Sequence, residues 1–503
     1  MQPTNIEHVG LLLNRYNSQQ LLEVARQLKE RTGCKVTAYL RQASEVIGFQ
    51  RTGGCSFVDR VICYDTFTPG LAETVIDDQV VYEAASNWER RMGHPLSWLL
   101  LDYRAVSTGF FALASRSPIS DNASEANHAQ VTAAILKQMS FWEVEIEKQG
   151  VDLFLDGASE LFAVSDYHGV TALRLCFARI RQRYYWADNK RLTPPNLKEA
   201  YASIIAPPVD DKEIDAPYEA ATVKLGQIYD TCTLKGTVRG ISIGLYRSAK
   251  ATALKLLGYN RKRPTIASAI SFPLARRSQF LQVRQLAREA AQRQAIRPGK
   301  YIYFPMHKEP EANWVVQTPE FTDQLAAIIA LSLAAPADIQ IVVKENIVAM
   351  GRRPTDFFEH LRRLKNVVVA DFDTSTLDLQ RKALATAGLA GTALMENAIE
   401  GRPSIAFAQD LPIDILDHVF TVRHNRDLPG IITKVRALDL PNSKSRSDGA
   451  RYSAAVEAAS FDLSSASLEN VGQKHGAETI KPAVDAILSY VEEKSKQPSA
   501  VIA

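Results

Sequence analysis

The sequence predicts an α/β protein built from two Rossmann-like domains that face a cleft, with a basic helical insertion between them. Three observations lead to this prediction. The 503 residues are more than one hydrophobic core usually supports. Short apolar runs typical of buried strands alternate with helical patterns, both at the start of the chain and again from residue 300. The segment between these two regions is strongly basic, whereas the rest of the chain is net acidic.

The first domain, residues 1–200, opens with a β-α-β pattern. The run EHVGLLL at 7–13 and the run CKVTAYL at 34–40 are typical of strands, and an amphipathic helix separates them. The first residues, MQPTNIEH, carry neither a basic n-region nor an apolar h-region, and no apolar run reaches the roughly 18 residues that span a bilayer. We therefore expect a cytoplasmic protein.

The run VDLFLDG at 151–157 predicts a buried strand that ends at Asp156. Ligands of doubly wound sheets bind outside the carboxyl ends of the strands. Asp156 and Glu160 are therefore candidates for a catalytic base or nucleophile. The same residues are also typical of an ordinary helix start, in which Glu160 would interact with the positive end of the helix dipole. Both interpretations stay open.

An arginine-rich segment, RIRQRYYWADN at 179–189, closes the first domain. Arg179, Arg181 and Arg183 alternate, so they would share one face of a strand and could bind an anionic sugar or a phosphate. A solvated arginine face above packed aromatic rings is the other interpretation.

Residues 201–299 are predicted to form a linker and a basic helical insertion. Between Leu234 and Lys300 there are fifteen Lys or Arg residues and a single acid, Glu289. Helical periodicity over 217–258 and 273–295 makes these segments amphipathic, which favours an anionic membrane surface as the partner. Nucleic acid is not favoured, because no nucleic-acid-binding motif accompanies the charge. Arginines that line a cleft for an acidic substrate are the third interpretation.

The C-terminal domain, residues 300–440, begins with the strand-like run YIYFP at 301–305. Pro305 ends the strand, and His307, Glu309 and Glu311 follow without an amphipathic spacing. At the carboxyl end of a parallel strand these three side chains are candidate catalytic residues.

Two further strands of this domain are followed by candidate donor-binding residues. The run IQIVVKEN at 339–346 ends in Lys344, Glu345 and Asn346. In the run TAGLAGTALMENAIEGRPSIAF at 386–407 a strand leads into a helix, and the candidates are Gly391, Thr392, Ala393 and Glu396. A helix N-terminus preceded by glycine offers unpaired N–H groups to a phosphate.

Other features exclude some classes of protein. The five cysteines form no C-x-x-C pair, so neither a disulfide framework nor a zinc site is expected, and we expect no D-x-D-like acid pair at a strand end. We expect no metal and no cofactor besides a nucleotide-sugar substrate. Residues 441–503 are predicted to comprise an irregular polar stretch at 440–449, helices at 451–460 and 476–494 that cross back onto the first domain, and a disordered tail from Ser495.

Taken together, the runs HKEPEAN at 307–313, KEN at 344–346 and GT-x-x-x-E-x-x-x-x-G-x-P at 391–403 resemble the capsule polysaccharide biosynthesis family of GT-B glycosyltransferases, which includes Kdo transferases. The resemblance is firm over 300–425 and weaker over the first 200 residues. In one place the sequence departs from the family pattern, because Asn346 stands where members usually have histidine.

The resemblance implies a GT-B-like fold and a metal-independent transferase. The donor would be CMP-Kdo or another CMP-linked acid sugar. The acceptor would be a lipid-linked or oligosaccharide precursor of capsule, lipopolysaccharide or a related surface glycan, at the inner face of the cytoplasmic membrane. Three alternatives remain open: a nucleotide-sugar epimerase of the same fold, a polyol-phosphate transferase, and a non-catalytic membrane-associated glycan assembly protein, which the departure at Asn346 favours.

Overall fold

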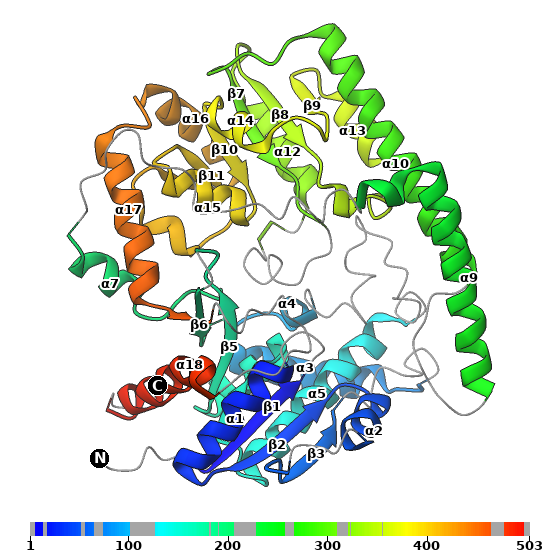
Figure 1. Ribbon diagram of the computed structural model, residues 1–503, viewed down its shortest axis with the longest axis vertical. Helices are drawn as coiled ribbons and strands as arrows, with labels where there is room; N and C mark the ends of the chain where they lie inside the picture. The colour runs from blue at the N-terminus through cyan, green and yellow to red at the C-terminus, as the bar shows by residue number, and fades with distance from the viewer. Residues whose placement is uncertain are drawn as a thin grey trace. The chain divides into compact units, whose positions relative to one another are not determined.

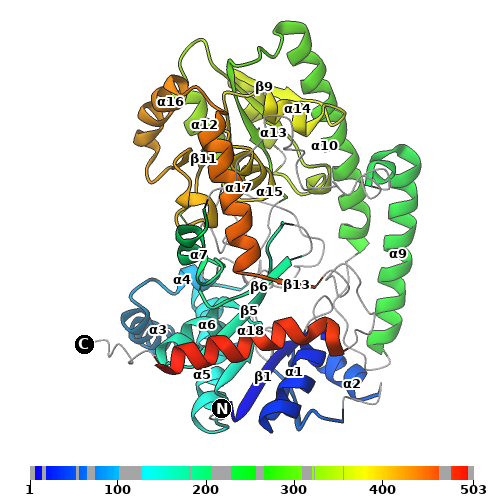
Figure 2. The ribbon, with the colours of Figure 1, turned by 60° about the vertical axis from the view of Figure 1, so that its left-hand side comes forward.

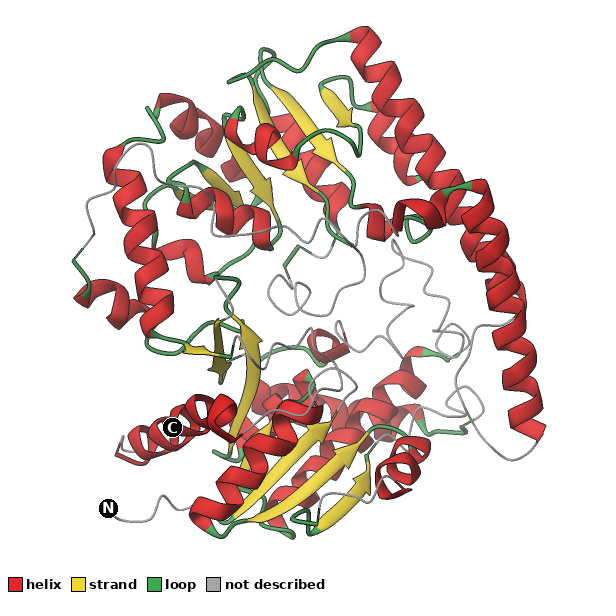
Figure 3. Cartoon of the chain, viewed as in Figure 1, coloured by secondary structure: helices red, strands yellow, loops and turns green. Residues whose placement is uncertain are grey.

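The computed structural model describes most of the chain as two compact units, each with its own sheet (Figures 1 and 3). Unit 1 comprises Met1–Leu100, Glu125–Ala202 and Ala455–Ala503, and unit 2 comprises Leu101–Ser124 and Ser203–Ala454. The residues described are 6–13, 18–51, 56–64, 74–100, 126–180, 183–189, 191–205, 228–256, 266–308, 320–321, 323–354, 356–463 and 477–496.

Unit 1 is built on a seven-stranded sheet in the order β13-β6-β5-β4-β1-β2-β3. The strands are β1 His8–Leu13, β2 Lys35–Leu40, β3 Arg60–Cys63, β4 Leu153–Leu155, β5 Thr171–Phe177, β6 Arg183–Ala187 and β13 Phe461–Asp462. The strands from β3 to β5 are parallel, whereas β6 and β13 are antiparallel to their neighbours. The chain adds β2 and β3 on one side of β1 and β4 and β5 on the other, which is the strand order of a Rossmann fold.

The helices of unit 1 pack on this sheet or on one another. They are α1 Ser18–Thr32, α2 Ala43–Arg51, α3 Asp78–Met92, α4 Ser97–Leu100, α5 His128–Glu147, α6 Ser159–Tyr167 and α18 Ala477–Lys496, and α7 Leu197–Ser203 lies at the boundary with unit 2. The C-terminal α18 packs against α1, and Trp186 Nε1 of β6 donates to the Ala483 carbonyl of α18 at 2.9 Å (Figure 2). Residues 497–503, which contain most of the predicted tail, lie outside the described residues.

Unit 2 is built on a six-stranded sheet in the order β12-β11-β10-β7-β8-β9, and all its strand pairs are parallel. The strands are β7 Tyr301–Pro305, β8 Gln340–Lys344, β9 Val367–Ala370, β10 Ala385–Gly388, β11 Ser404–Ala406 and β12 Val419–Thr421. The order again reverses beside the first strand, between β7 and β10. The predicted α/β architecture with two Rossmann-like sheets is therefore confirmed.

Helices of unit 2 connect and cover these strands. They are α9 Leu234–Leu256, α10 Ile266–Arg293, α12 Gln324–Ala334, α13 Phe357–Arg363, α14 Thr376–Arg381, α15 Thr392–Ile399, α16 Leu428–Ala437 and α17 Ser443–Ala458, with short 3-10 turns η3 Ile347–Ala349, η4 Pro412–Ile415 and η5 Asn425–Asp427. The basic insertion is helical as predicted over 234–256 and in α10, whereas 217–227 lie outside the described residues.

Two local predictions were wrong. The stretch 440–449 was expected to be irregular, but α17 begins at Ser443. Asn442, the residue before it, accepts a hydrogen bond on its Oδ1 from the Ser445 N–H at 3.0 Å. Gly449 lies inside α17, where a Cβ would approach the Ile399 carbonyl oxygen to 2.0 Å, so this close packing requires a glycine. The second is the expectation that no D-x-D-like acid pair stands at a strand end, because Asp371 and Asp373 directly follow β9.

The arginine segment does not form the single strand in which its three arginines would share one face. Arg179 lies in a bend with φ 60°, and only Arg183 belongs to β6. Arg181 lies outside the described residues.

Candidate active site

His307 lies just beyond the carboxyl end of β7, beside the point where the strand order of unit 2 reverses. Its backbone is held from two sides. Gln324, fully buried at the start of α12, accepts from the His307 N–H at 2.5 Å and donates to the His307 carbonyl at 3.1 Å. Arg353 Nη2 donates to the same carbonyl at 2.5 Å. The position of His307 is therefore set by side chains from distant parts of the sequence.

The imidazole of His307 packs directly on Gly391, which precedes α15. A Cβ at Gly391 would lie 2.2 Å from His307 Cε1, and Gly391 has φ 120° and ψ 174°, a conformation open only to glycine. His307 Nε2 also lies 4.0 Å from where a Cβ of Gly388 would be. Because Gly388 ends β10, the structure brings together the two predicted anchors at the β7/β10 switch point, the usual place for a ligand in an open α/β sheet.

Helix α15 presents its N-terminus at this point. Its N-cap is Gly391, so no side chain caps the first turn, and the backbone N–H groups there form a partly positive end. Thr392, Ala393 and Glu396 are all partly exposed on the first turns of the helix. The opposite side of α15 is anchored, because Asn397 Nδ2 donates to the Pro403 carbonyl at 2.8 Å.

Glu396 lies near the end of a polar chain of side chains. Burial raises the pKa of the Tyr303 hydroxyl on β7, a hydrogen bond with Thr376 opposes this, and the Glu396 carboxylate raises the pKa further. Thr376 Oγ1 in turn accepts from Lys344 Nζ at 3.0 Å. Lys344, Thr376 and Tyr303 thus form one polar group beside β7, and the Glu396 carboxylate lies near enough to act on it electrostatically.

Lys344 ends β8, in register with Pro305 of β7. Its ammonium also donates to the Thr374 carbonyl at 2.6 Å. Burial lowers the pKa of Lys344, while the carboxylates of Asp373 and Asp371 act in the opposite direction. An ammonium held in this way can still interact with one more anion.

Glu345 and Asn346 have structural partners. The carboxylate of Glu345 receives two bonds of 2.8 Å from the guanidinium of Arg353, and both side chains are buried. Asn346 Oδ1 accepts from the Val348 N–H at 3.0 Å and so caps η3. The ion pair uses the whole Glu345 carboxylate, whereas the cap uses only Oδ1 of Asn346, so of these two residues Asn346 stays a candidate donor contact through its amide Nδ2.

In unit 1, the carboxyl end of β4 lies beside β1, where the strand order of that sheet reverses. Asp156 has φ 67° and lies 3.6 Å from Arg174 Nε, measured from its Oδ1, and Arg174 also donates to the Gly157 carbonyl. Glu160 is fully buried in the first turn of α6. Asp156 therefore stands at a switch point of its own sheet. The remaining two candidates, Glu309 and Glu311, lie outside the described residues.

The sequence analysis missed Gln324, Arg353 and Gln279, which hold the site. Gln279 of α10 accepts from the Gly351 N–H at 2.8 Å and donates to the Arg353 carbonyl at 2.6 Å, so it fixes the loop that carries Arg353. One signal was available for Gln324, because it is a polar residue at the start of an otherwise apolar helix.

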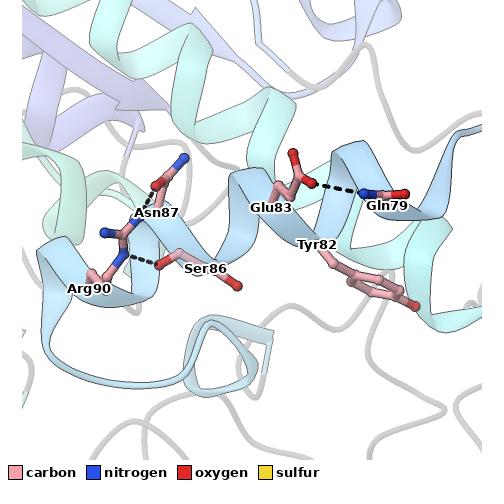
Figure 4. Close-up of a pocket in the computed structure, with 6 residues that line it drawn as sticks. All are labelled: Gln79, Tyr82, Glu83, Ser86, Asn87 and Arg90. Carbon is pink, nitrogen blue, oxygen red and sulfur yellow. Dashed lines mark hydrogen bonds between the residues drawn. The ribbon is translucent and has the colours of Figure 1, made fainter.

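A separate depression of about 750 Å³ lies along α3 (Figure 4). Its described lining comes from one helix face: Gln79, Tyr82, Glu83, Ser86, Asn87 and Arg90. Several of these side chains bond within the helix, such as Gln79 Nε2 to Glu83 at 3.1 Å. Most of the described lining groups therefore bond along their own helix, and Tyr82 stacks on His128 of α5, so they do not converge on a ligand.

No group of three or more His, Cys, Asp or Glu side chains among the described residues could hold a metal ion. No helix in the described part of the chain is long and apolar enough to cross a membrane.

No protein-family model matches the sequence, and comparison with curated proteins finds no match. Similar solved structures include a glycosyltransferase from Rickettsia africae (10% identity, 98% of this chain and 100% of that chain, TM-score 0.28). A UDP-N-acetylglucosamine 2-epimerase from Rickettsia bellii has 10% identity, 98% coverage of both chains and a TM-score of 0.28. The UDP-GlcNAc 2-epimerase from Neisseria meningitidis bound to UDP-GlcNAc has 10% identity, coverage of 96% and 100%, and a TM-score of 0.23.

At these scores the likenesses carry no argument about activity, and none singles out the capsule polysaccharide family. The Rossmann-like character of both units rests on the strand order and register described above.

Proposed function

We propose that the chain is a GT-B-type enzyme acting on a nucleotide sugar, and specifically a glycosyltransferase. The observation that carries the proposal is the packing of His307 on Gly391, where α15 begins at the β7/β10 switch point of unit 2. A ligand at this position would meet backbone N–H groups, a helix dipole and an imidazole together, which is the combination that suits a phosphate.

In this proposal the donor phosphate binds at the N-terminus of α15. The N–H groups of Thr392 and Ala393 and the Thr392 hydroxyl would donate to its oxygens, and Lys344 would add positive charge beside the His307 imidazole. Groups that are already oriented stabilise the charge that develops on the leaving phosphate without reorganisation, so this site would need no metal ion. A carboxylate would activate the acceptor hydroxyl, and Asp156, Glu160, Glu309 and Glu311 stay the candidates for this role.

The Glu396 carboxylate would accept from the ribose hydroxyls of the donor, one turn along α15 from the phosphate. Glu396→Ala should weaken nucleotide binding by about 1.5–3 kcal/mol, or roughly 10- to 150-fold, because a charged acceptor is lost. Isothermal calorimetry measures this directly. Glu359→Ala removes the same charge from an exposed position on α13 and serves as the matched control. Unchanged affinity in Glu396→Ala would exclude the ribose role.

The finer parts of the proposal concern the sugar and the acceptor. We propose a CMP-linked acid sugar such as Kdo as the donor and a capsule, lipopolysaccharide or related surface-glycan precursor, lipid-linked or oligosaccharide, as the acceptor. A thermal-shift screen of CMP-, UDP-, GDP- and CDP-linked compounds tests the donor. Product analysis then separates transfer to an acceptor from epimerisation of a free nucleotide sugar and from polyol-phosphate transfer. Binding of no nucleotide in the screen would overturn the proposal.

A further inference from the structure

Helices α9 and α10 form an antiparallel pair within unit 2 (Figure 2). Gly240 of α9 lies against Pro273 of α10, and Gly244 lies against Ala269, so residues later in α9 meet residues earlier in α10. A Cβ at Gly244 would come within 2.9 Å of the Ala269 Cβ. The small residues allow the two backbones to approach closely along one side of α9. The other side of α9 is left exposed.

The exposed side of α9 carries an apolar stripe. Leu234 is 63% exposed and Val238 is 57% exposed, and Leu245 and Ala249 are exposed as well. Counted from Leu234, these four residues stand at i, i+4, i+11 and i+15, which is a single line along a helix with 3.6 residues per turn. Residues that pack on a core are normally buried, so this stripe marks a contact surface.

A second stripe runs beside the first, one residue further along at each step. It consists of Lys235, Arg239, Tyr246 and Lys250, all of them exposed, and Tyr246 is 66% exposed. We call the two stripes together the α9 face; it consists of Leu234, Lys235, Val238, Arg239, Leu245, Tyr246, Ala249 and Lys250. Helix α9 contains no acidic residue in its 23 positions, so no carboxylate of the helix itself offsets these cations.

The first turns of α10 add further exposed apolar side chains. Ile266 is 63% exposed, and Ile270 and Leu274 are also exposed at spacings of four residues. These side chains form a separate exposed apolar line on the helix that packs against α9. The combination of apolar, aromatic and basic side chains without acids is typical of helices that lie in a membrane interface.

We propose that the α9 face docks onto a membrane surface that contains anionic phospholipid. The helix would lie in the plane of the interface over a length of about 35 Å, at 1.5 Å per residue. Its apolar stripe would enter the boundary between headgroups and acyl chains, and its cations would reach lipid phosphates. This inference goes beyond the proposed chemistry and is independent of it, because vesicle binding needs no nucleotide.

The charge and the apolar character of the α9 face together argue against a second copy of the chain and against nucleic acid as its partner. A symmetric dimer through the α9 face would bring the cations of one helix against the same cations of a second copy, with no acid on either helix to offset them. Nucleic acid would neutralise the cations but leave the apolar stripe in water. An anionic lipid surface is the partner that satisfies both stripes.

The test is co-sedimentation of the full-length protein with vesicles of phosphatidylcholine alone or mixed with phosphatidylglycerol. Wild type should bind only the mixed vesicles, and binding should fall as salt shortens the Debye length from about 10 Å at 0.1 M to about 3 Å at 1 M. The triple variant Lys235→Glu, Arg239→Glu, Lys250→Glu should bind at least about 100-fold more weakly, since each cation near an anionic surface contributes roughly fivefold.

Two controls separate docking from misfolding and from net charge. The variant Lys235→Arg, Arg239→Lys, Lys250→Arg keeps every charge and should bind like wild type. The variant Arg423→Glu, Arg426→Glu, Lys434→Glu makes the same change in net charge at exposed positions near α16 and should also keep binding. Replacing Val238 and Leu245 by serine should weaken binding without changing the charge.

Four results would overturn the proposal. The first is equal binding of the Lys235→Glu, Arg239→Glu, Lys250→Glu variant and wild type. The second is an equal loss of binding in the α16 variant. The third is a protein that sediments with neutral vesicles as well as with anionic ones. A dimer in analytical ultracentrifugation that the Val238 and Leu245 serine variant abolishes would likewise overturn it, by identifying a second copy as the occupant.

Discussion

The contact between His307 and Gly391 predicts that Gly391→Ala strongly lowers the local stability of α15, and that the size of the loss depends on the His307 imidazole. The new methyl group would lie 2.2 Å from His307 Cε1, far inside van der Waals contact, so the ring or the start of α15 must move. Such overpacking costs about 1–3 kcal/mol. The backbone at φ 120° and ψ 174° adds about 1–3 kcal/mol, because residues with a Cβ rarely adopt this conformation. We expect α15 to lose about 2–6 kcal/mol of local stability.

A double-mutant cycle with His307→Ala separates the two contributions. Without the imidazole the methyl group has room, so in that background Gly391→Ala should cost only the backbone share of about 1–3 kcal/mol. The coupling between the two positions should therefore be about 1–3 kcal/mol.

Amide hydrogen exchange read by mass spectrometry suits this measurement, because it reports the stability of α15 itself; about 1.4 kcal/mol corresponds to a tenfold change in protection. Gly430→Ala, at a position where a Cβ meets no atom within 4 Å, should leave exchange in α15 unchanged. If Gly391→Ala cost the same with and without His307, the imidazole would not pack on Gly391, and the proposed phosphate site would lose the observation that carries it.

Two further predictions concern carboxyl groups that burial affects. Glu345→Gln should lower the free energy of unfolding of unit 2 by about 3–5 kcal/mol, because it leaves the buried Arg353 guanidinium without its charged partner. Urea unfolding followed by circular dichroism measures this loss, and a loss no larger than that of the exposed Glu359→Gln would contradict the prediction. Burial raises the pKa of Asp414 to about 6, well above an unfolded value of about 4, so the free energy of unfolding should fall by about 2–3 kcal/mol as the pH rises from 4 to 6. Asp414→Asn should remove that pH dependence, and an identical profile in wild type and variant would show that the group titrates normally.

The sequence predicted those strands and turns of unit 2 that depend only on neighbouring residues. The strand at Tyr301–Pro305 and the strand at Gln340–Lys344 follow from apolar runs, and the turn at Gly391 follows from a glycine that precedes a helix. The stretch beginning at Ser443 shows the limit of such reasoning. Its polar composition and Gly449 suggested a loop, yet the glycine serves close packing of α17 on Ile399, which no local pattern reveals.

By itself, the sequence determined that this is an α/β protein with parallel strands and which residues follow those strands, because hydrophobic periodicity and turn chemistry act between neighbours in the chain. It also determined that α9 is basic and free of acids. Only the tertiary structure decided that Arg353 forms an ion pair with Glu345 and that the His307 ring packs on Gly391. Those contacts join residues from different strands and loops, and which of many polar side chains meet depends on strand order and packing, which local sequence does not encode.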